Sequence, residues 1–343
     1  MKSYSNKNYI FLCIFLFIVL IVSVFLSFGI GRYSQLRYTD IVRLLISSDS
    51  LKSDEALFVL LKLRTPRILV SIMVGGTLGI SGAVYQALFA NPIVSPDNLG
   101  VSHGASFGAV ISLVLGLSAG MMKGVAFVMG CLAVGMVFCV SNRISKGRNM
   151  TMYLILIGMV VSSVFSALLS IMKYVADPEN QLPQITYWLL GSFSKVTSED
   201  VFPVFAIFVI GIIPILLLRW RLNLLQLSDE EALAMGVRKK LIQIIVVICA
   251  TLLTSVSTSV TGGINWIGLI IPHIARLLVG NDYRKVTIIS LLLGSIFLVL
   301  LDDVARSITS SELPISILTS LIGAPIFLVL LFRDSKGGIL NER

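Results

Sequence analysis

The sequence predicts an all-α polytopic membrane protein with about ten transmembrane helices, and three observations support this fold class. The chain of 343 residues is 56% hydrophobic and 13% charged, whereas a soluble domain carries about 25% charged residues. Its mean hydropathy is +0.94. Apolar runs near the length needed to span a bilayer, roughly 20 residues, cover 9–30, 68–90, 105–122, 124–141, 152–172, 201–218, 241–260, 286–301 and 314–332, with a shorter, interrupted run at 264–280. Residues 1–343 are therefore expected to form a single transmembrane domain.

The first run, 9–30, is interpreted as a retained helix rather than a cleaved signal peptide. It is longer than the apolar core of a signal peptide, and no A-x-A cleavage site follows it. The four cysteines all fall inside apolar runs without metal-ligand spacing. They are expected to be packing residues.

Positive charge predicts the orientation. With ten spans and both termini inside, sixteen of the 27 lysines and arginines lie in inside segments, and four lie in the outside loops after the first one. Cytoplasmic loops carry an excess of these residues. Both termini are therefore expected in the cytoplasm of a multi-pass cell-membrane protein, and the net charge of +9 does not require nucleic acid as a partner.

The first outside loop contradicts this charge rule, because seven basic residues lie between Arg32 and Arg67. Arg64 and Arg67 flank a proline at the mouth of the second helix. They are either interfacial anchors whose charged heads reach water or basic contacts for an acidic external partner. In the ninth helix, Asp302 and Arg306 stand four residues apart, which is the spacing of a helical ion pair.

Two stretches resemble each other at an offset of 180 residues, "SGAVYQALFANP" (81–92) and "TGGINWIGLIIP" (261–272). The offset aligns Gly82 with Gly262 and Pro92 with Pro272. Five spans separate the copies, so an inverted repeat of helices 2–5 and 7–10 is expected, as in many transporters. Each proline is expected to bend or end its helix, at a point covered by protein or by a water-lined cavity.

Motifs of catalysis are absent from the sequence. It contains no G-x-x-x-x-G-K-[ST] phosphate loop and no visible nucleophile–base arrangement. The only histidines, His103 and His273, are 170 residues apart without cysteine neighbours, which argues against a zinc site. Neither an enzyme nor a bound metal or cofactor is expected, and His273 is expected to hydrogen-bond at the second helix break.

One polar, helix-prone segment, "LLQLSDEEALAMGVRKK" (224–240), lies between two inside-facing spans. Ser228 and Glu231 have the spacing of a capping box, and Gly236 is suited to end the short helix. The segment is either a solvated linker or a docking helix for a cytoplasmic motor.

A resemblance to a known family rests on five runs: "LRTPRILVSIMVGGTLGISGAVYQALFANPIVSPDNLGVSHGASFGA" (63–109), "YWLLGSF" (187–193), "LSDEEALAMGV" (227–237), "GGINWIGLIIPHIARLLVGNDYR" (262–284) and "ELPISILTSLIGAPIFLVLL" (312–331). With these runs the chain resembles the permease subunits of ABC importers for iron–siderophore complexes, haem and vitamin B12. The resemblance covers nearly the whole chain after the first helix.

The resemblance implies a ten-helix subunit that pairs with a second copy or a close paralogue. Two cytoplasmic ABC ATPase subunits and an external substrate-binding (lipo)protein would complete the importer. The family's coupling segment matches 219–240 here, with ATPase contacts at Ser228, Asp229, Glu230, Glu231, Ala232 and Gly236. Its external docking arginines match Arg64, Arg67 and Arg306.

The resemblance also implies an inner gate at Thr151 and Met152. Met152 departs from the pair of hydroxyl residues found in close relatives, which puts a polar gate in doubt. The two helix breaks, with Asn91, Pro92, Pro272 and His273, are expected to frame the inner mouth of the translocation path.

An alternative class is an ion-coupled secondary transporter, which would share ten helices and inverted repeats. Such a transporter should hold an ionisable group deep in its bundle, and helices 2 to 8 show no Asp or Glu at mid-span. An iron chelate is the first expectation for the substrate, with cobalamin and molybdate left open.

Overall fold

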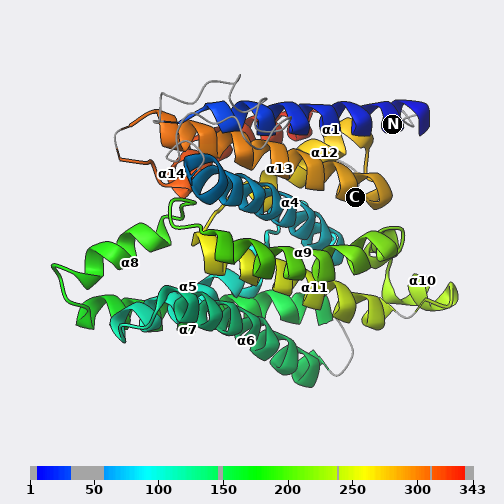
Figure 1. Ribbon diagram of the computed structural model, residues 1–343. Coiled ribbons are helices and arrows are strands. Elements are labelled where there is room, and N and C mark those ends of the chain that lie inside the picture. The colour runs from blue at the N-terminus through cyan, green and yellow to red at the C-terminus, as the bar shows by residue number, and fades with distance from the viewer. Residues whose placement is uncertain (1–5, 32–57, 146–149, 238, 310, 337–343) are drawn as a thin grey trace.

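The computed structural model describes residues 6–31, 58–145, 150–237, 239–309 and 311–336, and this part of the chain is a bundle of helices (Figure 1). The long helices are α1 (Asn6–Gly29), α4 (Thr65–Leu88), α6 (Ala119–Ser145), α7 (Met150–Val175), α9 (Ser198–Leu218), α11 (Lys239–Thr261), α13 (Tyr283–Ser307) and α14 (Ile315–Lys336). The shorter helices are α5 (Val101–Val114), α8 (Gln181–Leu189), α10 (Asp229–Ala234) and α12 (Ile267–Val279). Single turns are η1 (Val59–Arg64, π-helical), η2 (Pro96–Leu99) and η3 (Arg221–Gln226).

Seven of the described helices are long and apolar enough to cross a membrane, η1 and α4 counting as one span, and three further apolar helices, α5, α12 and α14, accompany them. The prediction of about ten transmembrane helices is confirmed. Two boundaries were misplaced: α5 ends at Val114 and α6 begins at Ala119. Gly116, in the left-handed conformation at φ +68, turns the chain earlier than the apolar run suggested.

Figure 1 shows the helices side by side, with α10 at one end of the bundle and α8 at the other. These are called the α10 end and the α8 end below. The helix α1 begins at the α10 end, and α14 begins at the α8 end.

The inverted repeat is visible in the order of the elements. A long, a short and two long helices, α4 to α7, recur as α11 to α14, with 24, 14, 27 and 26 residues against 23, 13, 25 and 22. The first helix of each repeat packs into the other repeat: α4 lies against α12 and α13, and α11 lies against α5 and α6. The two halves are therefore interlocked rather than juxtaposed.

The register predicted for this repeat is wrong. Gly82 is inside α4, but Gly262 lies beyond the end of α11 in the left-handed conformation at φ +74. Pro92 lies in the turn after α4, whereas Pro272 is inside α12. The 180-residue offset therefore does not match equivalent positions of the two copies.

Glycine makes the close approach of α4 to its neighbours possible. A Cβ at Gly75 would lie 2.3 Å from the carbonyl oxygen of Gly294 in α13. A Cβ at Gly82 would lie 1.9 Å from the carbonyl oxygen of Gly268 in α12. Backbones this close gain dispersion contacts along their whole length, which is the main attraction between helices in lipid.

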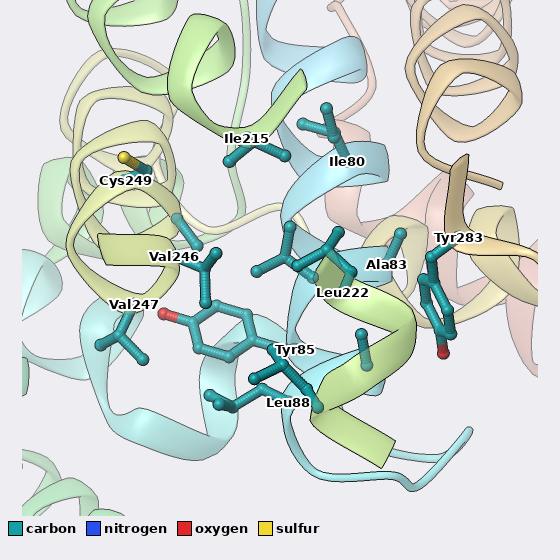
Figure 2. Packing of buried hydrophobic residues seen from close by; sticks show 14 of the residues in the cluster. Ile80, Ala83, Tyr85, Leu88, Ile215, Leu222, Val246, Val247, Cys249 and Tyr283 are labelled. Atoms are coloured by element: carbon teal, nitrogen blue, oxygen red, sulfur yellow. The ribbon is translucent and has the colours of Figure 1, made fainter. Parts of the chain in front are cut away.

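The core at the α10 end forms around Tyr85 of α4, which is fully buried (Figure 2). Leu222 of η3 and Val246 of α11 lie near its ring and belong to the same cluster of buried residues. The Tyr85 hydroxyl lies 3.4 Å from Oγ1 of Thr251. One short turn, η3, thus packs into the seam between α4 and α11.

Pro272 does not end its helix, as the sequence had left open, because α12 continues through it to Val279. The non-helical segment lies before the helix, at 262–266. A proline leaves the carbonyl four residues earlier without its helical donor, here that of Gly268. The side-chain amide of Gln86 in α4 lies 3.5 Å from this oxygen and 3.3 Å from that of Leu269. A neighbouring helix therefore replaces the missing donor.

We predict that Gly82→Val destabilises the bundle, because its side chain would collide with the α12 backbone at Gly268. Overpacking costs about 1–3 kcal/mol, and two backbones in contact cannot yield as a flexible side chain would. The thermal unfolding of purified protein in detergent measures the effect. The matched control is Gly124→Val in α6, where nothing lies within 4 Å of a Cβ. Equal melting temperatures for the two variants would contradict the role given to Gly82.

Candidate transport and docking sites

At the α10 end, the predicted capping box is present. The Ser228 amide donates to Glu231 Oε2 at 2.8 Å, and the Glu231 amide donates to Ser228 Oγ at 3.2 Å. The hydrogen bonds from the backbone and side chain of Ser228 lower the pKa of Glu231. Asp229, Glu230 and Ala232 follow within α10, and Ala232 is buried.

The short helix α10 ends where Gly236 takes the left-handed conformation, at φ +69. The amide of Val237 closes the turn by donating to the Ala232 carbonyl at 2.9 Å. Lys239 Nζ donates to the carbonyl of Leu227 at 2.7 Å, which joins the two ends of the segment. The α10 segment (228–237) therefore has a defined shape, and it presents Met235 with 63% of its surface exposed.

The turn η3 connects this segment to α13 through one side chain. Asn223 Nδ2 donates to Asp282 Oδ1 at 2.9 Å, and Asn223 Oδ1 accepts from the Tyr283 amide at 2.9 Å. Asp282 also caps α13 by accepting from the Arg284 amide at 3.0 Å. Burial tends to raise the pKa of Asp282, but the hydrogen bonds from Arg284 and Asn223 outweigh it and lower this pKa.

At the α8 end, Arg67 holds two carboxylates. Its Nε and Nη2 each lie 2.8 Å from an oxygen of Asp302 in α13, and its Nη1 lies 2.9 Å from Glu312 Oε1. The Asp302 side chain is 2% exposed, that of Arg67 11% and that of Glu312 29%. The Leu313 amide donates to the Ala305 carbonyl at 3.0 Å. The segment before α14 is thus fixed to both α4 and α13.

The other two arginines of this end fasten α1. Arg306 Nη2 donates to the carbonyl and to Oγ of Ser27, both at 2.6 Å, and pairs with Asp303. Arg64 donates to the carbonyl of Phe28. The predicted Asp302–Arg306 pair is wrong, because Asp302 is taken by Arg67 and Arg306 pairs three residues back.

Of the three arginines expected at an external docking surface, Arg64 and Arg306 are buried, each 5% exposed, and Arg67 is partly buried, with its side chain 11% exposed. Arg67 and Arg306 pair with carboxylates of the same subunit, and Arg64 donates to a backbone carbonyl. Such partners offset the cost of removing a charge from water. The contact of these arginines with a binding protein stays a prediction.

The residues predicted for the gate do not share one environment. Thr151 and Met152 lie in the first turn of α7, and Met152 is 59% exposed. Asn91 and Pro92 lie on an exposed turn after α4, where Asn91 Oδ1 accepts from the Ile93 amide at 2.9 Å. Pro272 and His273, in contrast, are buried in α12.

A hollow of about 500 Å³ opens beside the first turns of α14. Leu190, Ser316, Ile317, Ser320 and Leu321 line it. The amides of Ile315 and Ser316 donate to the carbonyls of Gly191 and Leu190 at 2.9 and 3.1 Å. The start of α14 is thereby attached to the segment after α8, and we call this hollow the α14 pocket.

Several residues that organise these sites were not found from the sequence. Glu312 and Asn223 are separated from their partners by 245 and 59 residues, so no local pattern indicates the pairing. For Asp282 a signal existed, since an aspartate directly before an apolar helix is typical of an N-cap. Lys123 in α6 pairs with Asp200 at 2.6 Å, 77 residues further along the chain.

Comparison with known proteins decides the family. The model of the FecCD transport family matches residues 19–333. The chain belongs to the FecCD transport family. It is 38% identical to the molybdate import system permease protein MolB of Haemophilus influenzae, over 95% of this chain and 96% of that protein. It is 39% identical to a Helicobacter pylori protein named "probable iron chelatin transport system permease protein", over 80% and 82% of the two chains.

A solved structure supports the fold of this FecCD-family chain. It is an inward-facing transporter assigned to the metal-chelate ABC type, with a TM-score of 0.84 and 37% identity, covering 94% of this chain and 99% of the other. The chain is therefore an ABC importer permease, an integral protein of the cell membrane. The predicted family is confirmed.

We predict that Arg67→Glu prevents stable folding of this permease, because it would place three carboxylates together in a nearly closed site. Removing one partner of a buried ion pair costs about 3–5 kcal/mol. The amount of folded protein in detergent, measured by size-exclusion chromatography, reports the loss. Lys195→Glu, at an exposed position after α8, serves as the control. A folded Arg67→Glu protein of normal stability would instead favour a free, external arginine.

Proposed function

We propose that the chain forms the translocation path for an iron chelate, a siderophore complex or haem, in an importer driven by a partner ATPase. The observation that carries the proposal is the α10 segment, a capped and largely exposed helix fastened at its base at one end of a membrane bundle. It offers a preformed surface to a soluble partner without needing to fold on binding.

The proposed assembly contains two permeases, as a homodimer or with a close paralogue, and two cytoplasmic ATPase subunits. The ATPases would dock on the α10 segment through Ser228, Glu231, Met235 and the turn at Gly236. The α10 end and both termini would then be cytoplasmic. An external substrate-binding protein would dock at the α8 end.

The translocation path is proposed to lie between the two permeases, lined by α7. That helix is largely exposed in the single subunit, since only 17% of its most apolar stretch is buried. It carries Ser163 and Ser170 at exposed positions. These serines are seven residues apart and so lie on one helix face; their hydroxyls donate to the carbonyls of Met159 and Ser166 and would offer polar groups to a hydrated path. Thr151 and Met152 would stand at its inner end.

The substrate is proposed from the names of relatives. Iron chelatin, hemin and cobalamin permeases are among them, and these names describe bulky, metal-bearing molecules. Molybdate is the second candidate, because MolB matches 95% of the chain.

The test reconstitutes the permease with its ATPase and binding protein in proteoliposomes and measures ATP-dependent uptake. We expect a ferric siderophore or haem to accumulate. Uptake of molybdate alone would replace the first candidate with the second. If none of these substrates accumulates although ATP is hydrolysed, the proposed substrate class is contradicted.

We predict that Gly236→Pro separates the ATPase from the permease. Proline fixes φ near −65°, so it cannot adopt the φ of +69° that ends α10. Co-purification of the ATPase with tagged permease measures docking. Gly116→Pro is the matched control, because Gly116 has φ +68° in the turn between α5 and α6. Normal ATPase recovery with Gly236→Pro would exclude the α10 segment as the docking element.

A further inference from the structure

We propose that Asn223 is a positioning residue that transmits movement of the ATPase-docking segment to the far end of the permease through α13. The proposal rests on the proposed function, since it requires the ATPase to act on the α10 segment.

The first step is the connection from α10 to η3. Only Leu227 and Ser228 separate η3 from α10, and Lys239 Nζ at the start of α11 holds the Leu227 carbonyl at 2.7 Å. The turn itself is firmly seated, because Leu222 and Leu225 are 0% and 2% exposed. A displacement of α10 therefore reaches η3 with little intervening flexible chain.

The second step is the connection from η3 to α13. The Asn223 amide group bonds this helix at two points, the capping carboxylate of Asp282 and the backbone amide of Tyr283, both at 2.9 Å. Two hydrogen bonds from one planar amide group fix both the distance and the orientation of η3 relative to the start of α13. Leu222 and Leu225 of the same turn pack in the apolar core, and such non-directional packing specifies direction less than hydrogen bonds do.

The third step is α13 itself. Its 25 residues, at 1.5 Å each, make a rod of about 37 Å. The helix starts at the α10 end and reaches the α8 end (Figure 1). It contains no proline between Tyr283 and Ser307, so it lacks the commonest cause of a sharp kink.

The fourth step is the charge network at the far end. Asp302 near the end of α13 holds Arg67, and Arg67 holds Glu312, three residues before α14 starts at Ile315. The first turns of α14 carry Ser316 and Ser320 of the α14 pocket. A movement of α13 would thus reach this pocket through ionic contacts rather than loose packing.

The test uses the complete importer in proteoliposomes, with the four native cysteines replaced and Ser320→Cys added as a reporter. The reactivity of this cysteine toward a membrane-impermeant thiol reagent is measured with and without nucleotide trapped on the ATPase. With Asn223 intact, we expect trapping to change the labelling rate. With Asn223→Ala, we expect the change and the substrate uptake to fall about five- to tenfold, the range of a modest coupling between sites.

A paired exchange distinguishes coupling from general damage. Asn223→Asp sets two carboxylates against each other and should uncouple transport. Adding Asp282→Asn restores a donor and an acceptor to the pair, because the introduced carboxylate accepts from both the new amide and Tyr283. We expect this double variant to recover most of the nucleotide response. Gln226→Ala, at an exposed position of the same turn, is the control without effect.

Three outcomes would overturn the proposal. These are an unchanged nucleotide response with Asn223→Ala, a double variant no better than Asn223→Asp, or loss of ATPase co-purification in the Asn223 variants, which would make the residue part of the docking surface or the core. Failure of the proposed function looks different: the ATPase would remain bound to the Gly236→Pro permease, whatever happens at Asn223.

Discussion

The close packing of α4 against two helices of the other repeat is the constraint on which the rest of this permease depends. In lipid, apolar side chains gain little by leaving their surroundings for one another, so attraction requires backbones in near contact. Gly75 and Gly82 allow this contact with α13 and α12. Once α4 is enclosed, its ends fall beside α12 and α13, and Gln86 and Arg67 find partners there. The polar contacts are thus a consequence of backbone proximity.

Polar contacts serve different purposes at the two ends of the bundle. At the α10 end, hydrogen bonds shape a small exposed helix without enclosing it. At the α8 end, three arginines and three carboxylates are folded inward and fasten α1, α4, α13 and the start of α14. One end presents a surface to a partner, and the other is a rigid joint within the subunit.

Composition and short-range patterns predicted this fold well. Apolar runs located about ten helices, and the Ser228–Glu231 spacing located the cap of α10, because hydrophobicity and capping act over a few residues. The effect of Pro272 was misjudged, because the donor that the Gly268 carbonyl lacks is supplied by the side-chain amide of Gln86, 182 residues away from Gly268. The partners of Arg64 and Arg67 inside the subunit lie 36 and 235 residues away in the chain, so no local pattern indicates them.

The interlocked repeats have a consequence for how the protein is made. Arg67 and its partner Asp302 are 235 residues apart in the chain, so the ribosome delivers the arginine long before its counter-ion. During that interval Arg67 is without Asp302, and α4 is without the neighbours that its glycines contact. The enclosure of α4 is therefore a late event, because α12 and α13 are synthesised after it.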